Sequence, residues 1–85
     1  MTTQSGELAA VLTDIWQEAL GVNGIEPDEN FADLGGDSMT ATVVTALIRE
    51  RLGVEAPLRL VFDHPTVAEL TEALVPALAV SGLPA

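Results

Sequence analysis

LAAVLTDIWQEAL, residues 8–20, carries the strongest indication of the fold class. Its large apolar side chains recur at steps of three and four, so they share one face of a helix. Glu7 and Asp14 fall on the opposite, solvated face. Ser5 is the expected N-cap and Gly21 can end the helix in the left-handed conformation, so we predict a helix over residues 5–20. The apolar face comprises Leu8, Val11, Leu12, Ile15, Trp16, Ala19 and Leu20.

The next segment, GVNGIEPDENFADLGGD at residues 21–37, has no helical periodicity. It combines turn residues with five carboxylates and is predicted to be a long loop. Loops of this length are uncommon in compact domains and tend to be functional. We expect Ile25, Phe31 and Leu34 to anchor it to the core.

Helical spacing resumes after this loop and predicts a second helix over residues 38–52. Asp37 can cap it and Gly53 can stop it. LRLVFD, residues 58–63, follows Pro57 and is predicted to be a short helix, since no second strand exists to pair with it. The apolar positions of the second helix are Met39, Val43, Ala46, Leu47 and Ile48.

A capping box formed by Thr66 and Glu69 predicts the start of the last helix. Pro76 should end or kink this helix near Leu74, because proline cannot donate to the preceding turn. The residues from about Val80 onward are expected to form a frayed tail. The chain therefore predicts one all-α domain over residues 1–85, with a core at about 5–78 and a tail at 79–85. Its architecture is a bundle of three longer helices and one short helix, with a long loop between the first two.

Composition narrows the possible functions. The 85 residues carry 13 acidic and 3 basic side chains, a formal net charge of −10. That charge argues against binding to nucleic acid or to an anionic membrane surface. Without lysine or cysteine, Schiff-base and thiolate chemistry are excluded. With neither a signal peptide nor a long apolar span, we expect a cytoplasmic, soluble monomer.

Ser38 follows two glycines, as the nucleophile of a G-x-S-x-G elbow does. The final glycine is missing, no strand precedes the serine, and His64 is the only histidine and is better explained as a turn residue. The acidic loop has the wrong spacing for an EF-hand, and a P-loop would need a lysine. We therefore predict no catalytic residue and no metal site, and consider the chain not to be an enzyme.

The position of Ser38 suits a residue that carries a group. Unsatisfied amides and the positive end of the dipole at a helix start would stabilise a phosphate attached there. The two preceding glycines leave room for another protein to reach the hydroxyl. The residues alone also permit a second interpretation, in which Asp37 and Ser38 only cap the helix of an unmodified interaction module.

FADLGGDSM, residues 31–39, resembles the attachment motif of phosphopantetheine-dependent carrier proteins, and most closely that of peptidyl carrier proteins of nonribosomal peptide synthesis. VFDHPTVAEL, residues 61–70, is similar to the segment leading into the last helix of that family. The resemblance covers about residues 8–74 and implies the four-helix carrier fold. Because the chain begins with almost no linker, it resembles a free-standing (type II) carrier.

The resemblance implies that a phosphopantetheinyl transferase attaches 4′-phosphopantetheine to Ser38, using Mg2+, with Asp37 in a supporting role. The thiol of the arm would then hold an aminoacyl or peptidyl group as a thioester. An adenylating enzyme would load it, and a condensation or tailoring enzyme would use it, in nonribosomal peptide or antibiotic biosynthesis. A polyketide-type acyl carrier is the alternative within the same class. The predicted partner-binding residues are Met39, Thr42, Val61 and Phe62.

Overall fold

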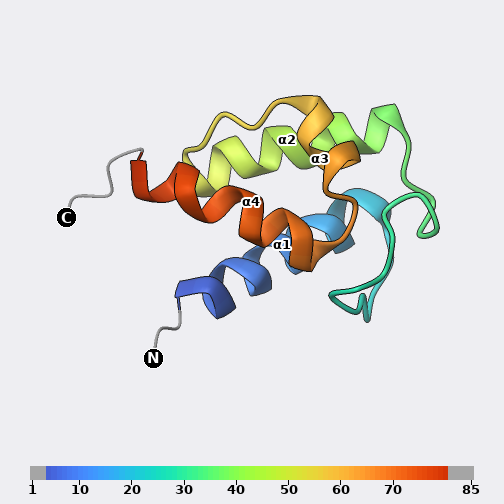
Figure 1. Ribbon diagram of the computed structural model, residues 1–85. Helices are drawn as coiled ribbons and strands as arrows, with labels where there is room; N and C mark the ends of the chain where they lie inside the picture. Colours follow the sequence, from blue (N-terminus) through green and yellow to red (C-terminus); the bar gives the residue numbers. More distant parts are fainter. Residues whose placement is uncertain (1–3, 81–85) are drawn as a thin grey trace.

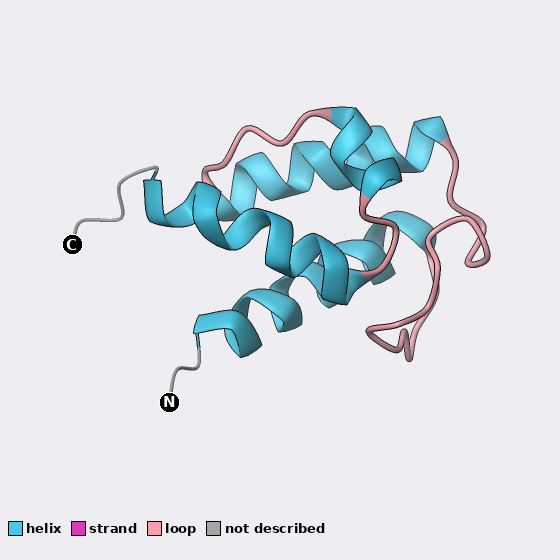
Figure 2. Ribbon diagram, viewed as in Figure 1, coloured by secondary structure: helices cyan, strands magenta, loops and turns pink. Residues whose placement is uncertain are grey.

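The computed structural model describes residues 4–80, which form four helices and no strand (Figures 1 and 2). The helices are α1 (Gln4–Leu20), α2 (Ser38–Leu52), α3 (Leu58–Asp63) and α4 (Val67–Val80). α1 packs against both α2 and α4, and the short α3 packs against α2. The predicted all-α bundle is confirmed, including the bounds of α2 and α3. Of the tail expected at 79–85, residues 79 and 80 instead belong to α4, and residues 81–85 lie outside the described part of the chain.

The core forms where the apolar faces of the helices meet. Leu12, Ile15 and Trp16 of α1 are fully buried, as the periodicity of residues 8–20 predicts. α1 begins one residue before Ser5, so Ser5 lies inside the first turn and its prediction as the N-cap was wrong. Gly21 follows the helix with a φ of 71°, the left-handed conformation expected of it. The other buried apolar residues are Leu8, Ile25, Phe31, Ala41, Val44, Ile48, Val54, Val61, Val67, Leu70 and Leu74.

The buried face of α2 differs from the expected one. Ala41, Val44 and Ile48 are buried, whereas Met39 and Val43 are exposed. α2 carries apolar side chains on more than one side, and periodicity alone does not say which side meets α1. The second apolar side of α2 is therefore available at the surface.

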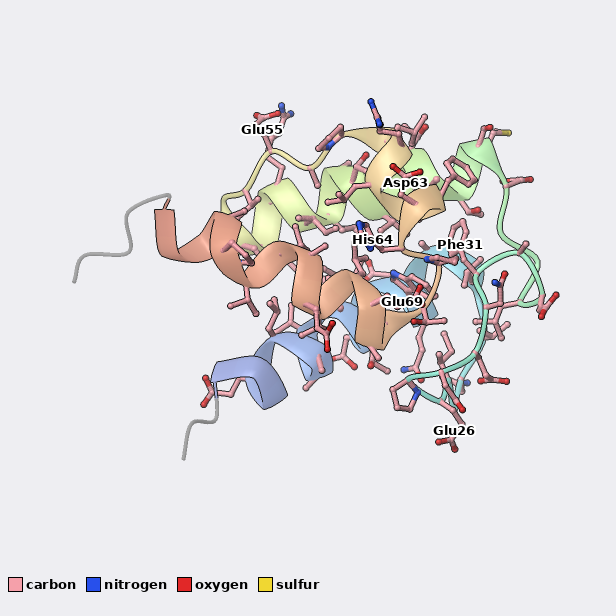
Figure 3. The ribbon with its side chains drawn as sticks, viewed as in Figure 1. Glu26, Phe31, Glu55, Asp63, His64 and Glu69 are labelled. Atoms are coloured by element: carbon pink, nitrogen blue, oxygen red, sulfur yellow. The ribbon has the colours of Figure 1, made fainter. Side chains whose placement is uncertain are left out.

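The loop at residues 21–37 is held by the core and by α4. Ile25 and Phe31 are buried and Leu34 is half-buried, as predicted. The Phe31 amide donates to the Pro65 carbonyl at 2.7 Å, and the amide of Ala68 donates to the carbonyl of Pro27 at 3.0 Å. The loop thus passes beside the start of α4, with Phe31 directed into the bundle (Figure 3).

Pro76 lies inside α4, which continues to Val80, so the prediction of an end or kink near Leu74 was wrong. Pro76 removes the amide that would bond the Glu72 carbonyl. Both residues are exposed, so water can satisfy that carbonyl, and the buried Leu74 holds the helix against the core. At the helix start, the amide of Glu69 donates to Thr66 Oγ1 at 3.1 Å, which confirms this half of the predicted capping box.

Candidate functional site

Ser38 is the first residue of α2, and it is exposed. The chain enters the helix through Gly35, whose φ of 95° is a conformation that favours glycine. The Ser38 carbonyl accepts from Thr42 Oγ1 at 2.9 Å. Among the hydrogen bonds of residues 4–80 none engages the Ser38 hydroxyl. The site therefore presents a free hydroxyl at the start of a 15-residue helix.

Asp37 caps α2, as the sequence predicts. Its Oδ1 accepts from the Thr40 amide at 3.0 Å, and its own amide donates to Thr40 Oγ1 at 2.7 Å. The bond from the Thr40 amide first, and then a bond that Thr40 Oγ1 donates to Oδ1 at 3.1 Å, hold the pKa of the Asp37 carboxyl below its ordinary value of 3.8. Asp37 is thus ionised at neutral pH and already uses part of the positive potential that was expected to stabilise a phosphate on Ser38.

Two pairs of exposed apolar residues lie on α2 and α3. Met39 and Val43 are 78% and 43% exposed, and Leu58 and Phe62 are 39% and 46% exposed. The members of each pair are four residues apart and so share a stripe of their helix. α3 packs against α2. We therefore treat the pair on α2 and the pair on α3, four residues in all, as one surface and call it the apolar surface pair of α2 and α3. Exposed side chains of this size are typical of interaction sites when they gather on neighbouring elements.

Three of the four predicted partner-binding residues are exposed and one is buried. Met39, Thr42 and Phe62 are exposed, whereas Val61 is fully buried. The prediction of Val61 as a surface contact was therefore wrong, because the short α3 must turn one side into the core. Val43 is exposed but was not among the predicted partner contacts, although its spacing of four from Met39 could have identified it.

All three arginines of the chain form ion pairs. Arg49 lies 3.5 Å from Glu55 and Arg59 lies 3.6 Å from Asp63, while Arg51 pairs with Glu18 of α1. These contacts are largely exposed and contribute little to stability. Because all three arginines are paired, none of them is left to present a free positive charge beside Ser38. The neighbours of Ser38 are the Asp37 carboxylate before it and, on α2, the exposed Met39 and Thr42.

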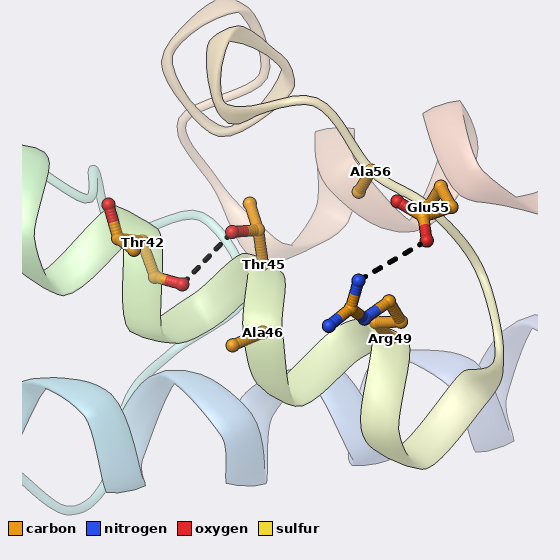
Figure 4. A pocket seen from close by; sticks show the side chains of 6 residues that line it. All are labelled: Thr42, Thr45, Ala46, Arg49, Glu55 and Ala56. Atoms are coloured by element: carbon orange, nitrogen blue, oxygen red, sulfur yellow. Dashed lines mark hydrogen bonds and ion pairs between the residues drawn. The ribbon is translucent and has the colours of Figure 1, made fainter.

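A pocket of about 220 Å³ lies between α2 and the segment that follows it (Figure 4). Thr42, Thr45 and Arg49 line its α2 side and follow Ser38 at steps of four, three and four, which places all of them on one stripe of the helix. Glu55 and Ala56 line the other side, and Ala46 completes the wall. The stripe that begins at Ser38 thus leads directly to this pocket.

The described residues do not assemble a metal or hydrolytic site. No group of three potential metal ligands occurs within residues 4–80. His64 caps the end of α3 through its amide, which donates to the Leu60 carbonyl at 2.9 Å, and no hydrogen bond in the described part of the chain joins it to Ser38. No helix in this part is long and apolar enough to cross a membrane.

Residues 10–74 match the family described as "Phosphopantetheine attachment site". The chain is 43% identical over 68 residues to tyrocidine synthase 3 of Brevibacillus parabrevis, covering 80% of this chain and 1% of that protein. It is 44% identical over 71 residues to surfactin synthase subunit 2 of Bacillus subtilis, covering 84% of this chain and 2% of the relative. The chain thus spans a very small part of these curated relatives.

Among solved structures, the fold is similar to that of BlmI, a type-II acyl carrier protein from Streptomyces verticillus involved in bleomycin biosynthesis. The TM-score is 0.85 at 33% identity, over 89% of this chain and 92% of that one. A peptidyl carrier protein solved with the phosphopantetheine transferase Sfp and coenzyme A gives a TM-score of 0.77 at 33% identity, over 81% and 90%.

Proposed function

The chain belongs to the phosphopantetheine attachment site family of carrier proteins, and from this premise we propose that Ser38 is the residue to which its 4′-phosphopantetheine is attached. The observation that carries the proposal is the exposed Ser38 hydroxyl, free of hydrogen bonds within residues 4–80, at the first position of α2. It lies in the run Gly35-Gly36-Asp37-Ser38, inside the matched residues 10–74.

In the proposed modification, the Ser38 Oγ–P bond forms as a P–O bond of the coenzyme A pyrophosphate breaks. The nucleotide half of coenzyme A leaves, and the hydroxyl proton passes to a base of the transferase. The protein supplies an accessible nucleophilic oxygen and no base of its own. Asp37 supports the reaction with its exposed carboxylate, which can contact the transferase or its metal while it caps α2.

The attached arm supplies the thiol that this cysteine-free chain lacks. We propose that the thiol carries an aminoacyl or peptidyl thioester in a nonribosomal peptide pathway, which the similarity to peptide synthetases supports. On this proposal the protein is a cytoplasmic carrier and not an enzyme. Its partners are a phosphopantetheinyl transferase, an adenylating enzyme and a downstream condensation or tailoring enzyme. They would meet it at Ser38 and at the apolar surface pair of α2 and α3.

Intact-mass spectrometry tests the attachment site. The wild-type protein, incubated with coenzyme A, Mg2+ and a broad-specificity transferase, should gain the mass of one phosphopantetheine group, and Ser38→Ala should gain none. Thr42→Ala is the matched control, because it removes a neighbouring exposed hydroxyl from the same stripe of α2. Thr42→Ala should also gain the mass of one phosphopantetheine group, because losing a docking contact can slow the transfer but leaves the Ser38 oxygen in place. An unmodified wild-type protein, or a modified Ser38→Ala, would contradict the proposal.

A further inference from the structure

We propose that Phe31 is a positioning residue for Ser38: its buried ring and its carbonyl oxygen fix the backbone of Gly36, two residues before the serine. This inference rests on the proposed function of Ser38 and concerns how the hydroxyl is presented to the transferase. Because Phe31 is fully buried, its ring would act through the backbone that it supports and not by direct contact with the transferase.

The first observation is the close approach of Phe31 to Gly36. A Cβ atom on Gly36 would lie 2.4 Å from both Cδ2 and Cε2 of the Phe31 ring and 2.7 Å from its Cζ. These distances are far inside van der Waals contact, so the ring lies directly against the Gly36 backbone. The φ of Gly36 is not positive, unlike that of Gly35. Gly36 is therefore required by the space that the ring occupies and not by its backbone conformation.

The second observation is that Phe31 is also bonded to this segment through its backbone. Its carbonyl accepts from the Gly36 amide at 2.9 Å and from the Leu34 amide at 3.1 Å. Its own amide donates to the Pro65 carbonyl, between α3 and α4. Phe31 thus holds both ends of the turn that leads to Ser38 and ties this turn to the start of α4.

The third observation is the aromatic environment of the Phe31 ring, which is 1% exposed. Its centroid lies 4.9 Å from that of Trp16 in the core and 6.3 Å from that of Phe62, with both pairs edge-to-face. Phe62 belongs to the apolar surface pair, and Figure 3 places Phe31 beside the segment joining α3 to α4. The Phe31 ring therefore lies between the backbone that leads to Ser38 and Phe62, a side chain of the surface that partners are proposed to contact.

The rate of modification depends on the position of the Ser38 hydroxyl relative to the docking surface, because misplacing a reacting atom by about 1 Å can lower a rate by roughly a hundredfold. Removing the ring with Phe31→Leu keeps an apolar side chain but leaves Gly36 unsupported. We expect kcat for modification to fall by about tenfold. KM should change little, because Phe62 and Met39 remain at the surface.

The contact itself is tested by a double-mutant cycle between Phe31 and Gly36. Gly36→Ala introduces the Cβ that meets the ring and should lower kcat more than Phe31→Leu does. In the double variant, the smaller leucine makes room for that Cβ. Its kcat should therefore exceed the value expected if the two losses multiplied, and it should recover toward that of Phe31→Leu alone.

Leu8→Ala is the control for destabilisation without displacement of the site. Leu8 is buried and belongs to the first half of α1. Figure 1 shows that the start of α1 and the start of α2 lie at opposite ends of the bundle. Assays run well below all melting temperatures should find Leu8→Ala modified at the wild-type rate. A Phe31→Leu variant that matches the wild type, a Leu8→Ala variant equally impaired, or losses that simply multiply would each overturn the proposal.

A second readout separates this inference from the proposed function, since it needs no transferase. Amide hydrogen exchange by NMR should be faster at Gly36 and Thr40 in Phe31→Leu than in the wild type, and unchanged there in Leu8→Ala. Unchanged exchange at both amides in Phe31→Leu would overturn the positioning role even if Ser38 is modified. If the wild type is not modified, the proposed function fails, and the exchange data still decide whether Phe31 fixes this turn.

Discussion

Asp37 caps α2 and so stabilises the helix start that carries Ser38. Its carboxylate bonds the Thr40 amide, and Thr40 Oγ1 returns a bond to the Asp37 amide. Replacing Asp37 with alanine removes the cap and should lower the melting temperature by several degrees. Asp37→Asn is the matched control, because asparagine caps helices about as well. The melting temperatures are measured by circular dichroism at neutral pH. An Asp37→Asn variant that melts as low as Asp37→Ala, and below the wild type, would contradict this role.

The lowered pKa of Asp37 also predicts a pH dependence. Because the folded state holds this pKa below 3.8, the stabilisation is fully present above that value and is lost as the pH falls through the lowered pKa. Other carboxyls titrate in the same range, so the comparison with Asp37→Asn isolates this group. Between about pH 5 and pH 2, the wild type should lose more stability than Asp37→Asn. Parallel pH profiles from thermal melts would contradict the prediction.

At the scale of the element, α3 sends two adjacent side chains in opposite directions. Val61 is fully buried and Phe62 is 46% exposed. Val61→Ala should lower the free energy of unfolding by about 2 kcal/mol, measured by urea denaturation, because it removes two buried carbons and leaves a cavity. Phe62→Ala should have a smaller effect on stability and raise the KM of the transferase several-fold. The reverse pattern would contradict the assignment of these two faces.

α4 offers a test of how a helix accommodates proline. Pro76 is exposed and breaks only the bond to the Glu72 carbonyl, so Pro76→Ala restores a donor without disturbing the core. We expect the free energy of unfolding to rise by about 1 kcal/mol, less than the roughly 3 kcal/mol of an interior site, because this proline lies near the helix end. Ala68→Gly, in an exposed position of the same helix, should instead be destabilising. A loss of stability in Pro76→Ala would show that its ring makes a contact that α4 needs.

The four elements differ in how much of their structure the local sequence encodes. Asp37 and Gly53 bracket α2 with their own hydrogen bonds, so its bounds could be predicted from residue types alone. In the six residues of α3, no periodicity distinguishes the buried Val61 from the exposed Phe62. The attachment motif could likewise be recognised from its residues, whereas the contact of Phe31 with Gly36 depends on how the loop folds back against Trp16.

At the scale of the whole molecule, the charge and the proposed docking surface are separate. The chain has a formal net charge of −10, and each arginine already pairs with a carboxylate. From Ser38 to Ile48, α2 contains no charged residue. The carboxylates are concentrated in the loop before Ser38 and on the other helices. Because they outnumber the arginines, they repel one another across the fold.

This self-repulsion predicts that salt stabilises the protein. Raising NaCl from about 0.02 M to about 0.3 M shortens the screening length from roughly 20 Å to roughly 6 Å, so the melting temperature should rise by a few degrees. Asp28→Asn/Asp33→Asn is the control, since both side chains are exposed and the pair removes two negative charges. Its melting temperature should depend less on salt than that of the wild type. A wild-type melting temperature that falls with salt would mean that the three ion pairs outweigh the repulsion among the carboxylates.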